Sequence, residues 1–318
     1  MNRWIERWNR YWFPRTSTLN LACCRIIAVA AELIWFFPSM DHQINLLSKN
    51  SQFSDPQPII RLITLIVPRD VFFTPTVFQW LHWLTVAAGV LAIIGLFTRV
   101  SLFVFAVGIW IFVSHAYSYA DLHHPEALYA IFLMLLAFSP AGESLSVDAL
   151  LRRRKGAAAE PATSDTAMWP LKLTHVLLAL TYFSTGATKL LVGGLGWMNG
   201  YTVQIYTFGD ALQSGHPFGV WLAQHHTLCV LLGAATVLFE LFYFVSLFLP
   251  RLAPLIFVSA ILFHLGLLVA AGQPFFEHIL LNALLLLFLD PEWFPAWLHR
   301  LEGQTLRWRR REQAQQAS

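Results

Sequence analysis

Long apolar stretches alternate with short polar breaks along most of the chain. Each stretch is close to the ~20 residues that an α-helix needs to cross the hydrocarbon core of a bilayer. The pattern therefore predicts an all-α fold, a polytopic integral membrane helical bundle with about eight transmembrane helices. The segment from Pro58 to Pro68 is too short to cross, so we expect it to lie on the membrane surface or to re-enter. We expect the spans near residues 19–37, 78–97, 101–119, 126–140, 169–191, 228–249, 253–272 and 275–290.

The composition agrees with a membrane protein and excludes an ordinary soluble enzyme. Hydrophobic residues make up 57% of the chain and charged residues only 12%, about half of the charged share of a typical soluble protein. The adjacent Cys23 and Cys24 fit neither a disulfide framework nor a metal-binding spacing, so we expect no metal. No Gly-rich phosphate loop is visible, and we expect no nucleic-acid partner. Residues 1–318 are interpreted as a single transmembrane domain.

The basic residues gather on alternate connections between the predicted spans. They precede the first span and follow the second, fourth, sixth and eighth spans. Because Lys and Arg are enriched on the cytoplasmic side of membrane proteins, this pattern places both termini in the cytoplasm. The small, polar stretch 152–167 then becomes a flexible cytoplasmic loop. Only Lys49, Arg61 and Arg69, in the long first connection, weaken the pattern.

Several ionisable residues fall inside predicted spans, where a charge costs roughly 2.5–3.5 kcal/mol on insertion scales. Arg25 and Glu32 in the first span are seven residues apart and so lie near one helical face, which favours a structural ion pair. For Glu240 in the sixth span, a structural and a functional role are equally open.

A second set of ionisable residues converges on the non-cytoplasmic side. It includes Lys189, His123, His124 and His264. A single membrane His is more often a packed residue than a catalyst, but convergence on one side favours a site. Apolar and small residues surround Lys189, so it is a candidate general base. The alternative is a lysine that extends from a span end to the membrane surface.

Four stretches together resemble one family. They are TYFSTGATKLLVGGLGWMNGY (181–201), GLFTRVSLF (95–103), a His-led span ending in Ser-Val-Asp (123–150) and FHLGLLVAAGQPFFEHILL (263–281). They resemble, in the same order, the transmembrane domain of vitamin K-dependent gamma-glutamyl carboxylase and its bacterial relatives, the horizontally transferred transmembrane (HTTM) family. The resemblance implies an integral membrane protein, expected in the bacterial inner membrane.

The resemblance also implies roles for particular residues. Lys189 takes the place of the active-site base, and His264 that of a functional histidine. Either His123 or His124 matches the family's other histidine. Substrate-binding positions are implied for the remaining motif residues, which are Arg99, Trp197, Gly200 and Tyr201. We expect Lys189, His264 and one of the two histidines to line a common, mostly apolar cavity in the outer half of the membrane.

The chemistry implied by the resemblance uses a reduced quinone, vitamin K hydroquinone or menaquinol, as cofactor. In the carboxylase a Lys deprotonates the quinol, oxygen adds to form a strong base, and that base removes a γ proton from a peptide Glu, whose carbanion captures carbon dioxide. The implied partners are membrane lipids, quinone and a secreted peptide or protein. Thr188 stands where the carboxylase has a Lys, and the sequence ends about 30 residues after its last predicted span. We therefore expect a relative without the lumenal part of the carboxylase, either a carboxylase-like lyase or a quinol-dependent oxidoreductase.

Two other classes of function stay open. The first is a non-enzymatic lipid- or quinone-binding factor in secreted-peptide maturation or immunity, which would bind its ligand in the same apolar pocket but would not convert it. A transporter of small solutes or protons would also explain intramembrane His, Glu and Lys, but it usually has repeated halves, which the sequence does not show.

Overall fold

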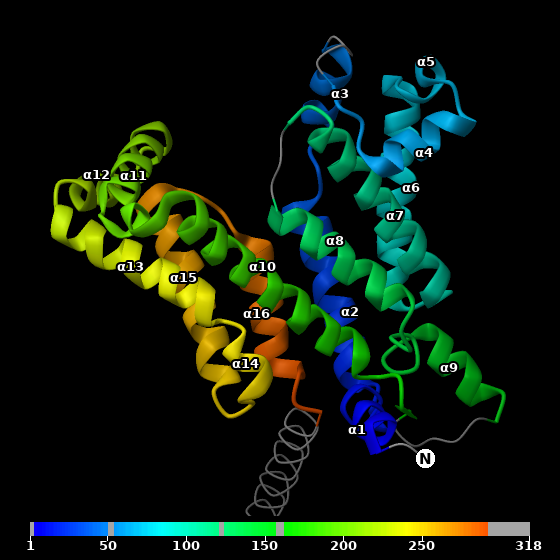
Figure 1. Cartoon of the computed structure of the whole chain (residues 1–318). Coiled ribbons are helices and arrows are strands. Elements are labelled where there is room, and N and C mark those ends of the chain that lie inside the picture. Colours follow the sequence, from blue (N-terminus) through cyan, green and yellow to red (C-terminus); the bar gives the residue numbers. More distant parts are fainter. Residues whose placement is uncertain (1–2, 50–53, 121–123, 157–161, 292–318) are drawn as a thin grey trace, which may run out of the picture.

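The computed structural model describes residues 3–49, 54–120, 124–156 and 162–291. Within these residues nearly all secondary structure is helical (Figure 1), which confirms the predicted all-α fold. The one small sheet there pairs β1 (Thr16–Ser17) with β2 (Thr163–Ser164) in antiparallel fashion. His123 lies outside the described residues.

In the first half of the chain, α2 (Leu19–Ala31) continues as the π-helical turn η1 (Glu32–Phe36). Before it lies α1 (Arg3–Trp12). After it come α3 (Met40–Ser48), α4 (Pro58–Ile66), α5 (Arg69–Phe72), α6 (Pro75–Ile94), α7 (Thr98–Tyr117), α8 (His124–Ala137) and α9 (Val147–Arg154). Helix α2 packs against α6 and α8.

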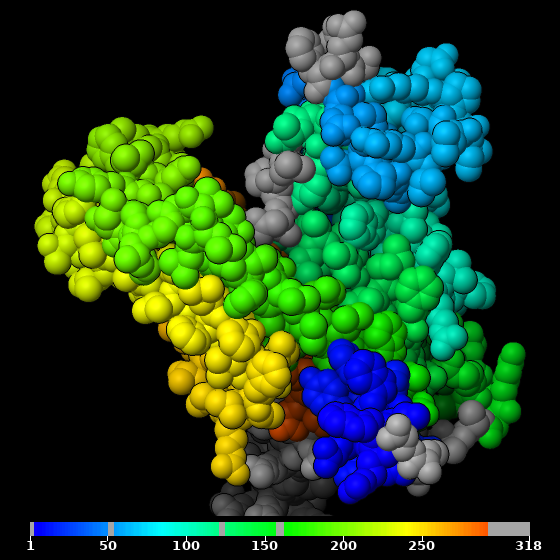
Figure 2. Space-filling view, viewed as in Figure 1, coloured from blue at the N-terminus to red at the C-terminus, as the bar shows by residue number. Residues whose placement is uncertain are grey.

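The second half is built around α10 (Trp169–Gly193), which continues as the 3-10 turn η3 (Gly194–Met198). It is followed by α11 (Tyr201–Ser214), α12 (Pro217–Ala223), α13 (His226–Phe242), α14 (Val245–Phe248), α15 (Ala253–Ala271) and α16 (Phe276–Phe288). In Figure 1 the helices of the two halves form two groups, and α16 packs against both α8 and α15. Figure 2 shows that the groups diverge toward the end where α3 and α12 lie.

Among the described residues, six helical segments are long and apolar enough to cross a bilayer. They are Leu19–Phe36, Pro75–Ile94, Thr98–Tyr117, Trp169–Met198, His226–Phe248 and Ala253–Ala271. Two shorter apolar helices, Pro125–Ala137 and Phe276–Phe288, occupy the predicted fourth and eighth spans. All eight segments overlap the ranges predicted from the hydrophobic pattern, and the protein is an integral membrane protein of the helical-bundle class.

The two ends of the molecule differ in charge. Helices α1 and α9, with three Arg each, lie at one end, which we call the Arg-rich end, whereas α3, α5, α11 and α12 lie at the opposite end, which we call the outer end (Figure 1). Apart from Arg69 on α5 and Arg61 on α4, this separation agrees with the positive-inside rule. That the Arg-rich end faces the cytoplasm stays a prediction.

The segment from Pro58 to Pro68 forms the short helix α4. Ile60 is buried, while Leu65 and Ile66 are exposed, and α4 packs along α7. Nine residues are too few to cross the bilayer, which agrees with the prediction of a surface-lying or re-entrant segment.

Two of the family-like stretches meet at the Arg-rich end. The carboxylate of Asp148 on α9 accepts hydrogen bonds from the backbone N–H groups of Phe97 (2.9 Å) and Thr98 (2.7 Å) and from the Thr98 hydroxyl (2.7 Å). These donors belong to the first turn of α7, so Asp148 caps that helix. Partial burial raises the pKa of Asp148, but the hydrogen bonds outweigh it and hold the pKa below its ordinary value.

The predicted ion pair between Arg25 and Glu32 is wrong. The buried guanidinium of Arg25 instead donates to the carbonyl oxygens of Ala141 (2.8 Å) and Leu145 (2.5 Å), in the connection between α8 and α9. The carbonyls of a non-helical segment are free to accept these bonds. Arg25 therefore anchors this connection, and Glu32 lies elsewhere.

Candidate functional site

Lys189 on α10 forms a short ion pair with Glu240 on α13. Its Nζ lies 2.5 Å from each carboxylate oxygen, and the two side chains are 20% and 7% exposed. Gly186, one turn earlier on α10, lets the helices approach, because an added Cβ would lie 2.9 Å from the backbone nitrogen of Leu241. The pair is thus held between two closely packed helices.

Trp197 completes the surroundings of Lys189. The ammonium nitrogen lies 4.9 Å from the centroid of the Trp197 ring, within the range of a cation–π interaction. The ring comes from η3, which folds back beside the end of α10: a Cβ at Gly193 would lie 3.0 Å from the Trp197 side chain. Lys189 therefore has a carboxylate on one side and a flat apolar face on another.

A buried polar cluster lies two turns before Lys189 on the same face of α10. The hydroxyl of Tyr182 is 2.8 Å from Nε2 of His264 on α15 and accepts a hydrogen bond from the Asn282 amide (3.3 Å) on α16. The Asn282 oxygen accepts from the Tyr243 hydroxyl (2.8 Å), and the Tyr182 and Tyr243 rings are stacked, with centroids 4.2 Å apart. All four side chains are buried.

The ion pair and the cluster are carried by the same two helical segments. Lys189 and Tyr182 are both on α10. Glu240 is on α13, and Tyr243 follows one turn later at the C-terminal end of that helix. The ion pair and the cluster that contains His264 thus lie within two turns of each other along α10 and one turn along α13, inside an apolar bundle. Because such groups are costly in a membrane, their concentration marks a candidate site.

Lys189 and His264 are predicted site residues, but part of their environment was not predicted from the sequence. Tyr182, Tyr243 and Asn282 were not identified. Asn282 had a visible signal, since it is an isolated amide in the apolar run of α16. Tyr182 belongs to the family-like stretch 181–201, but neither tyrosine was separated from its neighbours, because an aromatic residue in a span is usually a packing residue.

Two other residues of the lysine motif, Gly200 and Tyr201, pack against α13. Gly200 has φ +86°, and an added Cβ would lie 2.7 Å from Cγ2 of Val230, so it permits the close approach of α11 to α13. Tyr201 is largely exposed, and its ring packs against His226, with centroids 4.5 Å apart.

Arg99 lies in a different part of the molecule. It is in the first turn of α7 and lines a surface cavity of about 550 Å³ together with Glu143, Asp148 and Arg152. Because α7 begins at the Arg-rich end and α10 ends toward the outer end (Figure 1), the structure does not bring Arg99 to Lys189. A substrate-binding role for Arg99 stays a prediction that this geometry does not support.

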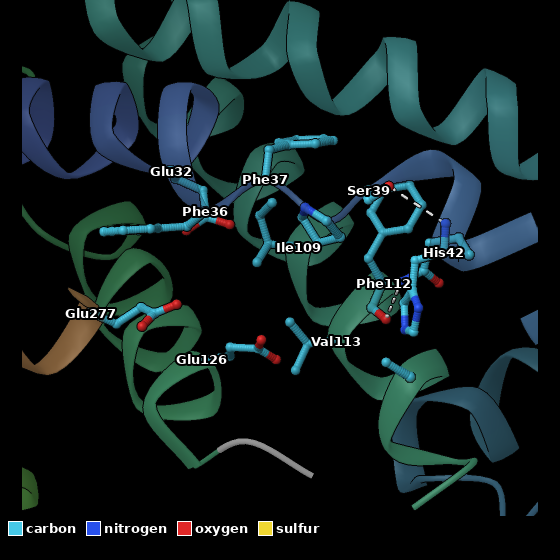
Figure 3. Close-up of a pocket in the computed structure, with 13 residues that line it drawn as sticks. Glu32, Phe36, Phe37, Ser39, His42, Ile109, Phe112, Val113, Glu126 and Glu277 are labelled. Atoms are coloured by element: carbon cyan, nitrogen blue, oxygen red, sulfur yellow. Dashed lines mark hydrogen bonds between the residues drawn. The ribbon is translucent and has the colours of Figure 1, made fainter. Parts of the chain in front are cut away.

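The outer half of the bundle contains a cavity of about 230 Å³ (Figure 3). His124 is the first residue of α8, and its side chain lies outside the described part; Glu126, two residues later, lines this cavity. Neither Lys189 nor His264 lines it, so their sharing a cavity with His123 or His124 stays a prediction. Its described lining residues are Glu32, Phe36, Phe37, Pro38, Ser39, His42, Gln43, Ile109, Phe112, Val113, Ala116, Glu126 and Glu277.

The cavity and the buried cluster are neighbours through α16. Glu277 lines the cavity, and the next residue, His278, has its ring centroid 5.2 Å from that of His264 and 5.9 Å from that of Tyr182. Two consecutive residues of α16 therefore contact the cavity and the buried cluster, respectively.

Comparison with known proteins gives one match. A family model described as the HTTM domain matches residues 16–293, which includes every helix of the ion pair, the cluster and the cavity. No curated protein and no solved structure matches the chain.

Proposed function

Because the chain belongs to the HTTM family, we propose that it is a quinol-dependent membrane enzyme of the carboxylase type, in which Lys189 removes a proton from the quinol. The observation that carries this proposal is the buried Lys189–Glu240 ion pair beside Trp197. It supplies a basic nitrogen, a group that stabilises that nitrogen once protonated, and a flat face of the kind on which a quinol ring packs.

The ion pair suits proton abstraction for an electrostatic reason. When the pair has lost one proton, the neutral amine of Lys189 and the carboxylate of Glu240 together carry one negative charge in a medium of low dielectric constant. Transfer of the quinol's O–H proton to Nζ makes the pair neutral overall and leaves a quinolate. The resulting ammonium is held 2.5 Å from both oxygens of Glu240, so the product of the transfer is stabilised.

The surface around the end of α10 suits a lipid-soluble cofactor. Leu191, Val192 and Leu195 are strongly exposed and follow directly after Lys189. In a bilayer these side chains contact acyl chains, and the isoprenoid tail of menaquinol has the same chemistry. We propose that the quinol arrives laterally along this surface and that His264 and Tyr182 bind it or the second substrate.

The test is quinol turnover by the purified protein in lipid nanodiscs. Vitamin K hydroquinone or menaquinol is supplied with oxygen, and epoxide and quinone are quantified. We expect Lys189→Ala to lower turnover by about 10²- to 10⁴-fold, the usual contribution of a general base. Added ethylamine should restore part of the activity, since it supplies a base in the vacated space.

Two further variants make the test specific. Lys172→Ala is the matched control, because Lys172 is on the same helix but donates to the backbone carbonyl of Tyr11; it should retain turnover. Lys189→Arg should be inactive, because a guanidinium keeps its proton. Full activity of Lys189→Arg, or equal losses in the two Ala variants, would contradict the role of Lys189.

The assay also separates the alternatives. Quinol binding without turnover would indicate the non-enzymatic quinone-binding role, and proton movement across the membrane without quinol oxidation would indicate a transporter. Under the proposal the second substrate is a secreted peptide or protein, the protein resides in the bacterial inner membrane, and both termini are cytoplasmic.

A further inference from the structure

The cavity in the outer half of the bundle is lined by carboxylates from three separate helical segments. Glu32 comes from η1, Glu126 from α8 and Glu277 from α16. Figure 3 shows their oxygens directed toward the same space. No Lys or Arg is among the described residues that line it, so none of them offsets the charge of Glu32, which favours a positively charged occupant.

Glu32 provides a second and independent observation. It is only 4% exposed, and within the described part of the chain its carboxylate makes no hydrogen bond or ion pair. Glu32 also opens the π-helical turn η1, and such turns are frequent at functional sites. A buried carboxylate costs several kcal/mol unless a partner offsets its desolvation. Glu32 is therefore placed to accept hydrogen bonds from a bound group.

The aromatic part of the wall favours an organic cation. Phe36, Phe37 and Phe112 line the cavity beside the carboxylates, and aromatic faces attract ammonium groups. The volume of about 230 Å³ holds roughly seven water molecules at about 30 Å³ each. Among the described residues no group of His, Cys, Asp and Glu has the geometry to hold a metal ion.

We propose that this cavity binds the ammonium group of an organic amine. Glu32 accepts its N–H donors, Glu126 and Glu277 complement its charge, and the phenylalanine rings contact its carbon skeleton. His42 is exposed and lines the cavity, so the amine can enter at the outer end. This site shares no residue with the Lys189–Glu240 ion pair, and the inference does not depend on quinol chemistry.

The test is isothermal titration of the purified, full-length protein in detergent micelles with benzylamine. Benzyl alcohol, which is similar in size and uncharged, is the matched ligand, and protein-free micelles provide the blank. We expect benzylamine to bind and benzyl alcohol to bind at least about tenfold more weakly, since hydrogen bonds to charged groups contribute about that much.

Variants assign the binding to the cavity. Glu32→Gln keeps the shape of the side chain and should weaken benzylamine binding about tenfold or more. Glu143→Gln, which removes a carboxylate from the other cavity, should leave it unchanged. If Glu32→Gln does not fold, Glu277→Gln serves in its place, with the same expected loss.

Three results would overturn the proposal: no benzylamine binding above the blank, equal binding of benzyl alcohol, or undiminished binding in the folded Gln variant of the cavity. Quinol turnover of the same variants is measured in parallel. A variant that loses amine binding but keeps turnover shows that the cavity is independent of the proposed enzyme site.

Discussion

The Lys189–Glu240 ion pair makes a sharp prediction about stability. Replacing Lys189 with Met leaves the carboxylate of Glu240, 7% exposed, without its cation. Removing one partner of a buried ion pair costs about 3–5 kcal/mol, whereas replacing both partners with uncharged side chains of similar volume is often close to neutral. We therefore expect Lys189→Met to lose about 3–5 kcal/mol and the double variant Lys189→Met, Glu240→Leu to lose much less.

The measurement is reversible unfolding in mixed micelles, followed by circular dichroism as the share of denaturing detergent increases. Wild type, both single variants and the double variant form a double-mutant cycle, which isolates the coupling energy between the two side chains. Lys172→Met is the control for loss of a lysine on the same helix. It should cost less, because Lys172 donates to a backbone carbonyl and has no buried carboxylate to leave behind.

The cycle can refute the reasoning in two ways. If each single variant loses less than about 1 kcal/mol, the pair behaves like a solvent-exposed ion pair, and the burial argument fails. If the loss of the double variant equals the sum of the single losses, the two side chains are not coupled. Either result would also remove the electrostatic basis of the proposed proton transfer.

Three further predictions concern packing, capping and topology. Gly186→Ala should cost about 1–3 kcal/mol in the same unfolding assay, because its Cβ would lie 2.9 Å from the Leu241 backbone nitrogen; an unchanged midpoint would show that the helices can separate freely. Asp148→Asn should cost about 1 kcal/mol, since the charge-assisted hydrogen bonds from the first-turn donors, including Thr98, become neutral and roughly half as strong. Because the folded pKa of Asp148 is depressed, its contribution is complete above about pH 4 and is lost as the pH falls through that folded pKa, so the difference from wild type should vanish in acid. Reporter fusions in the loop 152–167 should report a cytoplasmic location, and a periplasmic signal would reverse the topology.

The spans could be predicted because the bilayer restricts what the backbone can do. A helix satisfies all of its own hydrogen bonds, so every segment that crosses must be both helical and apolar for its whole length. Glycine marks where such segments turn: Gly95 has φ +73° between α6 and α7, and Gly272 has φ +70° between α15 and α16. The apolar length of a segment and the glycine at a turn are both local features, so they can be read directly from the sequence.

The candidate site could be predicted only in part because it depends on contacts between distant segments. Lys189 was visible as an isolated charge, but its partner is 51 residues away, and helical periodicity does not say which helices are neighbours. The same limit explains the error at Arg25 and Glu32. Their spacing indicated a common face, but the carbonyl acceptors of Arg25 are 116 and 120 residues away, and no pattern along the chain indicates them.

The first turn of α16 gives the molecule a mechanical link between its two polar regions. Glu277 lines the carboxylate cavity, and His278 contacts His264 and Tyr182 of the buried cluster. Adjacent residues of a helix point about 100° apart on one rigid frame, so neither side chain can be displaced by rotation of that turn without displacing the other. An occupant whose binding to Glu277 rotates this turn would therefore also change the position of the His278 ring relative to His264. In that case reciprocity requires that a ligand bound at the cluster change the affinity of the cavity for its occupant by the same factor by which the occupant changes the affinity of the cluster for that ligand.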